Sequence, residues 1–140
     1  MRFWDSSAVV SLLIQEASTA VLRAFHEKDP EQTVWCLTPV EVISALSRRA
    51  REGLPAEQDD AIRSALAVLS DRWREVGSLE LVRSRAVRLL NTHALRAADA
   101  LQLGAALVAC DERSEALPFV CLDERLREAA RKEGFPLLPA

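Results

Sequence analysis

The sequence predicts an α/β domain in which helices cover both faces of a central parallel sheet. Short apolar or β-branched stretches of strand length alternate along the chain with longer stretches of helical periodicity. Helical segments separate the predicted strands, as the connections between parallel strands require. The 140 residues contain no internal repeat and no low-complexity linker. We therefore expect one three-layer α/β/α domain over residues 1–140.

The predicted elements follow one another along the whole chain. Strands are expected at 2–4, 33–37, 79–82, 118–122 and 136–138, and helices at about 7–28 in two stretches, 38–52, 55–76, 84–91, 95–110 and 123–133. The first strand, Arg2–Trp4, is apolar and ends at Asp5, and Asp29-Pro30 marks a turn before the second. Thr33–Leu37 predicts a strand because it combines β-branched, aromatic and apolar residues.

The helices have recognisable ends and faces. Thr38 is placed as an N-cap with Pro39 in the first helical position, and Gly53 follows the arginines of the last turns. Pro55–Val76 is predicted to be one long helix because apolar residues recur on one face. These are Ile62, Leu66, Leu69 and Trp73.

The second half of the chain continues the alternation. Leu79–Val82 is predicted to be a strand, followed by a short helix. Leu95–Cys110 is apolar nearly all round, as expected of a buried helix. Pro118–Leu122 is predicted to be a strand, and Gly134 ends the helix that follows it.

Composition excludes several classes of protein. Hydrophobic residues make up 49% and charged residues 28%, as in globular proteins. No apolar run reaches the about 18–20 residues of a membrane span, and Asp5 interrupts any secretory signal, so we expect a cytoplasmic protein without a membrane partner. The three cysteines are far apart and have no nearby histidine, which argues against a disulfide framework or a zinc site. The net charge of −3 does not itself indicate nucleic-acid binding, although an acidic metal pocket would lower it.

Four carboxylates are candidate catalytic residues. Asp5 follows the first strand, Asp123 follows the strand at 118–122, and Glu41 lies in the first turn of the helix after the strand at 33–37. Ligands of parallel sheets bind beyond the carboxyl ends of the strands, where these three acids would meet. Asp99 lies in the apolar 95–110 segment, where its charge requires a cation or an arginine as compensation.

Each acid also has a purely structural interpretation. Asp5 and Asp123 are natural N-caps, and Thr38-x-x-Glu41 has the form of a capping box. Arg96, three residues before Asp99, would neutralise it on the same helix. The chain has no phosphate-binding glycine loop, no nucleophile elbow and no histidine with a catalytic partner. The four acids are therefore its main candidate catalytic groups.

Four segments, in order, resemble the motifs of the PIN-domain family, in particular its VapC-like toxins. The opening "hydrophobic-D-[ST]-[SN]" motif resembles Phe3–Val10, and the second resembles Thr38–Leu46. The third resembles Leu95–Ala106, and the closing motif resembles Cys121–Leu126. The resemblance implies a sheet of about five parallel strands and an acidic pocket that holds Mg²⁺ or Mn²⁺.

The resemblance also assigns roles to residues. It implies an acidic set of Asp5, Glu41, Asp99 and Asp123, with Asp5 and Asp99 as direct metal ligands and the other two acting partly through water. Ser6 or Ser7 matches the family's hydroxyl position, and Arg96 is a candidate contact for the substrate strand. The chain departs from the family at Gln102, where many relatives have His, and at Cys121, where Thr or Ser is common.

The function implied is that of a metal-dependent endoribonuclease, the toxin of a toxin–antitoxin pair, which hydrolyses RNA with a metal-activated water. A homodimer and an antitoxin that covers the pocket are the expected partners. The apolar segment Ala8–Ile14 would supply the dimer face unless neighbouring helices bury it. The alternatives are a PIN-domain nuclease of RNA processing and a non-catalytic regulatory α/β domain. A receiver-like domain would need an acidic pair at the first strand end, where this chain has Asp5-Ser6-Ser7.

Overall fold

The sheet has five parallel strands in the order β3-β2-β1-β4-β5. The computed structural model describes residues 1–140. Its elements are β1 (Arg2–Trp4), α1 (Ser6–Leu13), α2 (Thr19–Lys28), β2 (Gln32–Trp35), α3 (Thr38–Arg51), α4 (Ala56–Ser70), β3 (Arg74–Val76), α5 (Leu79–Thr92), α6 (Ala97–Ala109), the 3₁₀ turn η1 (Ser114–Ala116), β4 (Phe119–Val120), α7 (Glu124–Lys132) and β5 (Leu137–Leu138). The predicted α/β class and parallel sheet are confirmed.

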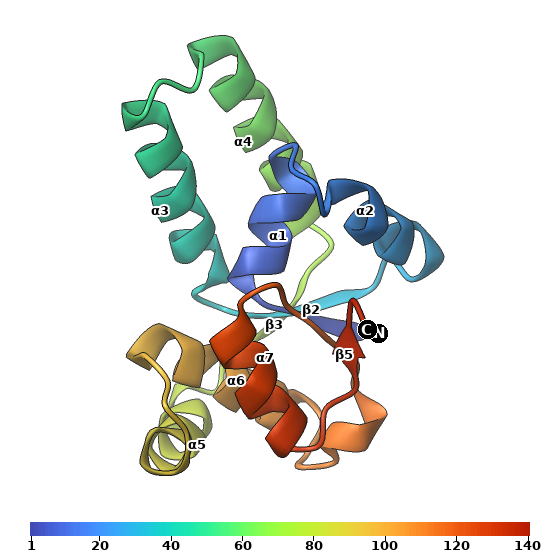
Figure 1. The fold of residues 1–140 in the computed structure, drawn as a ribbon, viewed down its shortest axis with the longest axis vertical. Helices are drawn as coiled ribbons and strands as arrows, with labels where there is room; N and C mark the ends of the chain where they lie inside the picture. Colours follow the sequence, from blue (N-terminus) through green and yellow to red (C-terminus); the bar gives the residue numbers. More distant parts are fainter.

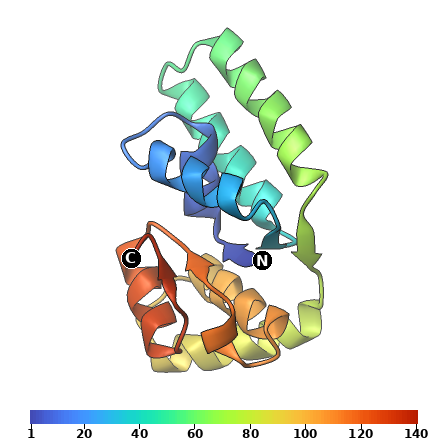
Figure 2. The same ribbon diagram turned by 90° about the vertical axis from the view of Figure 1, so that its right-hand side faces the viewer.

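Helices cover both faces of the sheet, with α1–α4 on one face and α5–α7 on the other (Figures 1 and 2). Successive strand residues point to opposite faces, so each strand supplies both cores. Phe3 and Trp35 belong to the core under α5, α6 and α7, whereas their neighbours Trp4 and Val34 belong to the core under α1–α4. The result is the three-layer arrangement that the alternation of strands and helices predicts.

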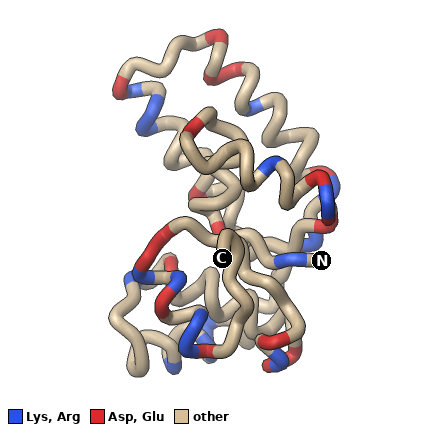
Figure 3. Tube along the Cα trace, turned by 45° about the vertical axis from the view of Figure 1, so that its right-hand side comes forward, with Lys and Arg blue, Asp and Glu red and all other residues tan.

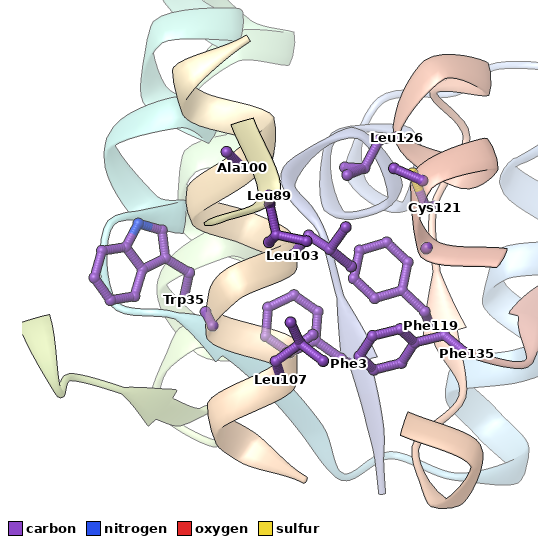
Figure 4. Close-up of a cluster of buried hydrophobic side chains, with 14 of the residues drawn as sticks. Phe3, Trp35, Leu89, Ala100, Leu103, Leu107, Phe119, Cys121, Leu126 and Phe135 are labelled. Carbon is purple, nitrogen blue, oxygen red and sulfur yellow. The ribbon is translucent and has the colours of Figure 1, made fainter. Parts of the chain in front are cut away.

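Aromatic side chains from the strands fill the centre of the larger core (Figure 4). The rings of Phe3 and Phe119 stack with centroids 5.4 Å apart, and Phe135 packs on Phe119 at 5.5 Å. Leu103 and Leu107 of α6 cover these rings from above the sheet. This packing fixes α6, and with it the helix start that carries Asp99.

Two predicted elements are wrong in the middle of the chain. The predicted helix Pro55–Val76 ends at Ser70, and Arg74–Val76 forms the edge strand β3. The predicted strand Leu79–Val82 is the first turn of α5. The alternation of apolar and polar residues over four positions resembled a strand, but the buried side chains of α5 recur at helical spacing. These are Val82, Ala86 and Leu89.

Sheet order places a ligand site beside β1. The chain leaves β1 toward β2 and β3 on one side and returns to β4 and β5 on the other, so the direction of strand order reverses between β1 and β4. Open parallel sheets bind ligands at such a switch point, beyond the carboxyl ends of the strands. Trp4 pairs with Val120, so the two strands end at the same level, next to Asp5.

None of the helices combines the length and the apolar character that a membrane crossing requires.

Candidate functional site

A cavity of about 870 Å³ lies beyond the carboxyl ends of the strands, and all four predicted carboxylates line it. It is bordered by the starts of α1, α3, α6 and α7. The acidic lining residues are Asp5, Glu41, Asp99, Asp123 and Glu124, and the hydroxyl-bearing ones are Ser6, Ser7, Ser11 and Ser44. The fold thus brings together residues that are up to 118 positions apart in the sequence (Asp5 to Asp123).

Asp5 is buried in this cavity, with 3% of its surface exposed. Its Oδ1 accepts hydrogen bonds from the backbone N–H of Ala8, at 3.3 Å, and from Oγ of Ser7, at 2.8 Å. The capping role expected for Asp5 is therefore real, and both of these hydrogen bonds reach the same carboxylate oxygen, Oδ1. Burial outweighs these hydrogen bonds and raises the pKa of Asp5 to about 7.

Glu41 is held by two donors rather than by a helix cap. Oγ of Ser6 donates to one carboxylate oxygen at 2.5 Å, and Nε2 of Gln102 donates to the other at 3.3 Å. Nε2 of Gln102 also donates to the hydroxyl of Thr38, at 3.0 Å. The capping box suggested by Thr38 and Glu41 does not form, because α3 has no side-chain cap and Thr38 is its first helical residue. Burial is the main reason that the pKa of Glu41 is raised.

Asp99 and Asp123 both line the cavity, and their negative charges repel each other. The helix α6 begins at Ala97, so Asp99 lies in its first turn and not in the middle of a buried helix, as the sequence suggested. The Asp99 side chain is half-buried. Burial first, and then the charge of Asp123, raises its pKa, while the charges of Arg96 and Arg125 oppose the shift. Asp123 is exposed and caps α7 by accepting from the backbone N–H of Leu126 at 2.9 Å.

Ser6 and Ser7 serve different carboxylates. Ser6 holds Glu41, whereas Ser7 donates to Asp5 and accepts from the backbone N–H of Leu122 at 3.1 Å. Ser7 thereby ties the start of α1 to the segment after β4. The buried thiol of Cys121 lies 4.0 Å from Oγ of Ser7, behind the cavity lining, and burial raises the pKa of this thiol, so it stays neutral.

The donor set fits a hard divalent cation, although the side chains are not arranged around one. No three Asp, Glu, His or Cys side chains stand close enough together to hold a metal ion. Carboxylate and hydroxyl oxygens are nevertheless the donors that Mg²⁺ and Mn²⁺ prefer. A buried carboxylate without an ion-pair partner, Asp5, and the repelling pair of Asp99 and Asp123 are the features that a cation would compensate.

Three arginines join the acids in the lining: Arg48, Arg96 and Arg125. Arg96, predicted from the sequence, is exposed at the start of α6. Arg125 was not among the candidates predicted from the sequence, although its place two residues after Asp123 puts it near the acids. Of the arginines that end α3, only Arg48 reaches the cavity, and Arg49 pairs instead with Glu16 at 2.7 Å.

The comparisons with known proteins concern the family and the fold of the chain. No protein-family model matches the chain. Two curated proteins of Mycobacterium tuberculosis, ribonuclease VapC45 of strain CDC 1551 and ribonuclease VapC49 of strain H37Rv, are each 31% identical to it, over 99% of this chain and 94% of theirs. The crystal structure of FitAcB from Neisseria gonorrhoeae shares the fold, with a TM-score of 0.67 at 13% identity over 98% of this chain and 96% of that one. Because identity at this level extends over nearly the whole length, the chain belongs to the VapC-like family of PIN-domain toxin ribonucleases.

Proposed function

We propose that the protein is a divalent-metal-dependent endoribonuclease that cleaves RNA in the acidic cavity and acts as the toxin of a toxin–antitoxin pair. The observation that carries the proposal is the convergence of Asp5, Glu41, Asp99 and Asp123 on one cavity in a member of a ribonuclease family. Mg²⁺ or Mn²⁺, when bound, would neutralise charge on the scissile phosphate and lower the pKa of the attacking water.

The hydrogen bonds of the acids support a division of roles among them. The hydrogen bonds that Oγ of Ser7 and the N–H of Ala8 donate to Asp5 both reach Oδ1, and the Asp99 side chain forms no ion pair and accepts from the backbone of Arg96, so these two acids are proposed as direct metal ligands. Both oxygens of Glu41 are engaged by Ser6 and Gln102, which suits contact through water. Asp123 has one oxygen engaged in its cap and is proposed to act in the same way.

The basic residues at the rim are proposed to hold the substrate. Arg96 and Arg125 lie near enough to Asp99 for their charges to affect its pKa, which places cations beside the acids. Arginine binds phosphate oxygens through a planar fork of donors. These side chains would offset the repulsion between an RNA strand and the carboxylates.

The proposed partners follow from the same site. An inhibiting antitoxin would cover the cavity that the four acids line. The homodimer gains no support from the Ala8–Ile14 segment, because Ala8, Val9, Leu12 and Ile14 are buried within the chain itself. It stays a prediction, which light scattering of the purified protein tests.

Cleavage of a labelled RNA pool tests the proposal. We expect the parent protein to cut RNA with Mg²⁺ or Mn²⁺, to lose cleavage in EDTA, and to lose it in the Asp99→Asn variant. Asp60→Asn is the matched control, since Asp60 is an exposed acid of α4 outside the cavity. Cleavage that survives in EDTA and in Asp99→Asn would refute the proposal.

A further inference from the structure

A second cavity, of about 210 Å³, adjoins the acidic one. One wall is the connection between α5 and α6, at Thr92, His93 and Ala94. The other wall is a single face of α7, because its lining residues recur at intervals of three and four. These are Arg125, Glu128, Ala129 and Lys132.

Arg125 connects the two cavities, since it lines both of them. It is exposed, and none of the ion pairs of the structure involves it. Lys132, two turns further along α7, brings a second cation to the smaller cavity. The one carboxylate there, Glu128, is shared between Lys132 at 3.7 Å and Arg131 at 2.5 Å, so the cavity keeps an excess of positive charge.

The wall opposite α7 is fixed in place. Nε2 of His93 lies 2.7 Å from Glu133, and Arg88 binds the same carboxylate at 2.8 Å. The side chain of His93 is only 7% exposed. A cavity with a rigid wall and two cations on the other side is suited to a phosphate group.

A third cation lies on the other side of the acidic centre. Arg48 follows Glu41 by seven residues on the same face of α3, which separates them by about 10 Å along the helix. Small side chains, Ser44 and Ala45, line the stretch between them. The helices α3 and α7 cover opposite faces of the sheet (Figure 1), and Arg48 lines only the acidic cavity whereas Lys132 lines only the smaller one.

Neither cavity lining contains Phe or Trp, the larger aromatic side chains on which bases stack, and the one ring there, His93, is nearly buried and bound to Glu133. Charged residues are spread over the whole trace rather than gathered on one side (Figure 3). Individual basic side chains beside the cavities, and not a large basic surface, would therefore bind the phosphates. Contacts to phosphates position a strand without reading its sequence.

We infer that the RNA strand crosses both cavities, with phosphates on one side of the scissile bond bound by Arg125 and Lys132, and a phosphate on the other side bound by Arg48. This inference rests on the proposed ribonuclease function and names the path of its substrate. The flanking sites are expected to accept any base.

Binding of a fluorescent single-stranded RNA in EDTA, measured by anisotropy at several salt concentrations, tests the path. Arg125→Gln, Lys132→Gln and Arg48→Gln should each weaken binding and reduce the slope of log K against log salt by about 0.7, the value for one phosphate of a single strand. Arg83→Gln is the matched control, because Arg83 is an exposed arginine of α5 that lines neither cavity. Shortening the RNA from one end should abolish the effect of Arg125→Gln and Lys132→Gln, and shortening it from the other end should abolish that of Arg48→Gln.

Two results would overturn the path while leaving the ribonuclease intact. One is that Arg125→Gln and Lys132→Gln bind RNA like Arg83→Gln although the parent cleaves it. The other is that all three variants respond equally to shortening at either end. A parent protein that cleaves no RNA with any divalent metal would instead contradict the proposed function.

Discussion

Gln102 donates a hydrogen bond from Nε2 to the carboxylate of Glu41 at 3.3 Å, although the two residues belong to helices on opposite faces of the sheet. Gln102 is 1% exposed, and its Oε1 has no hydrogen-bond partner. A buried amide with one unsatisfied atom is costly, and the donor group of this amide is directed at Glu41, so we expect Gln102 to position that acid.

Replacing Gln102 with Leu should impair the site more than the fold. Without the amide, Glu41 keeps only the hydrogen bond from Ser6, and we expect Mn²⁺ affinity and the cleavage rate to fall by about 10-fold or more. The free energy of unfolding should change by no more than about 1 kcal/mol, because removal of the unsatisfied Oε1 offsets the loss of the hydrogen bond to the buried Thr38. Calorimetric Mn²⁺ titration, urea unfolding and cleavage assays separate these effects. Gln102→His, which restores a ring N–H donor, should recover part of the affinity, and a Gln102→Leu variant with parental Mn²⁺ affinity would exclude the role.

Asp5→Asn should stabilise the protein in EDTA at pH 8. The pKa of Asp5 is about 7 in the fold against an ordinary value of 3.8, so the folded state binds this proton more tightly than the unfolded state. The favourable contribution of the neutral acid is fully present below about pH 4 and is lost as pH rises to about 7, at a cost of up to about 4 kcal/mol. Asn cannot ionise and retains an oxygen for the N–H of Ala8. Thermal unfolding in EDTA should show a higher melting temperature for Asp5→Asn than for the parent at pH 8. At pH 4 this difference should disappear. Melting temperatures that are equal for Asp5→Asn and the parent at pH 8 as well as at pH 4 would contradict a pKa of Asp5 raised by burial.

Gly104→Ala should destabilise the fold. A Cβ at this position would lie 3.1 Å from the carbonyl oxygen of Val82 and 3.3 Å from the backbone nitrogen of Ala86, so α5 and α6 would have to separate. We expect a loss of about 1–3 kcal/mol despite the better helix propensity of Ala. Urea unfolding measures it, with Gly77→Ala as the control because no atom lies within 4 Å of its added Cβ. A Gly104→Ala variant as stable as the parent would show that the two helices can shift without cost.

His93→Ala should weaken the fold without abolishing RNA cleavage. The ring contacts Glu133 at 2.7 Å outside the acidic cavity, and Arg88 remains bound to that carboxylate in the variant. A hydrogen bond to a charged group contributes about 1.5–3 kcal/mol. Chemical denaturation gives the loss. Single-turnover cleavage at saturating RNA, below the new melting temperature, should stay within a few-fold of the parent, because His93 lines the smaller cavity and not the acidic one, so its loss affects RNA binding rather than the cleavage step. Complete loss of cleavage in a folded His93→Ala protein would assign this residue to the catalytic machinery instead.

The sequence predicted what depends on local pattern. Asp5 and Asp123 could be placed at one sheet edge because each follows an apolar strand, and parallel strands end on the same side. Leu79–Val82 was misassigned because four residues are too few to distinguish a two-residue from a 3.6-residue period.

The tertiary contacts of the site could not be read from the chain. The hydrogen bond between Gln102 and Glu41 joins residues 61 positions apart, and no local pattern specifies such a pair. Nothing in the sequence distinguishes Arg125 and Lys132 from the other charged residues of the helix predicted at 123–133. Only the fold shows that the connection at Thr92–Ala94 stands opposite them and forms a cavity.

Mn²⁺ binding and RNA cleavage, followed over one series of Mn²⁺ concentrations, together show whether the acidic cavity is a metal-dependent site of RNA cleavage. Calorimetry and single-turnover cleavage would be applied to the parent, Asp5→Asn, Asp99→Asn and the control Asp60→Asn. We expect cleavage by the parent and by Asp60→Asn to rise over the concentrations at which Mn²⁺ binds. We expect Asp5→Asn and Asp99→Asn to lose both Mn²⁺ binding and RNA cleavage. Undiminished cleavage by Asp5→Asn and Asp99→Asn, or cleavage that is complete before any Mn²⁺ binds, would contradict this expectation.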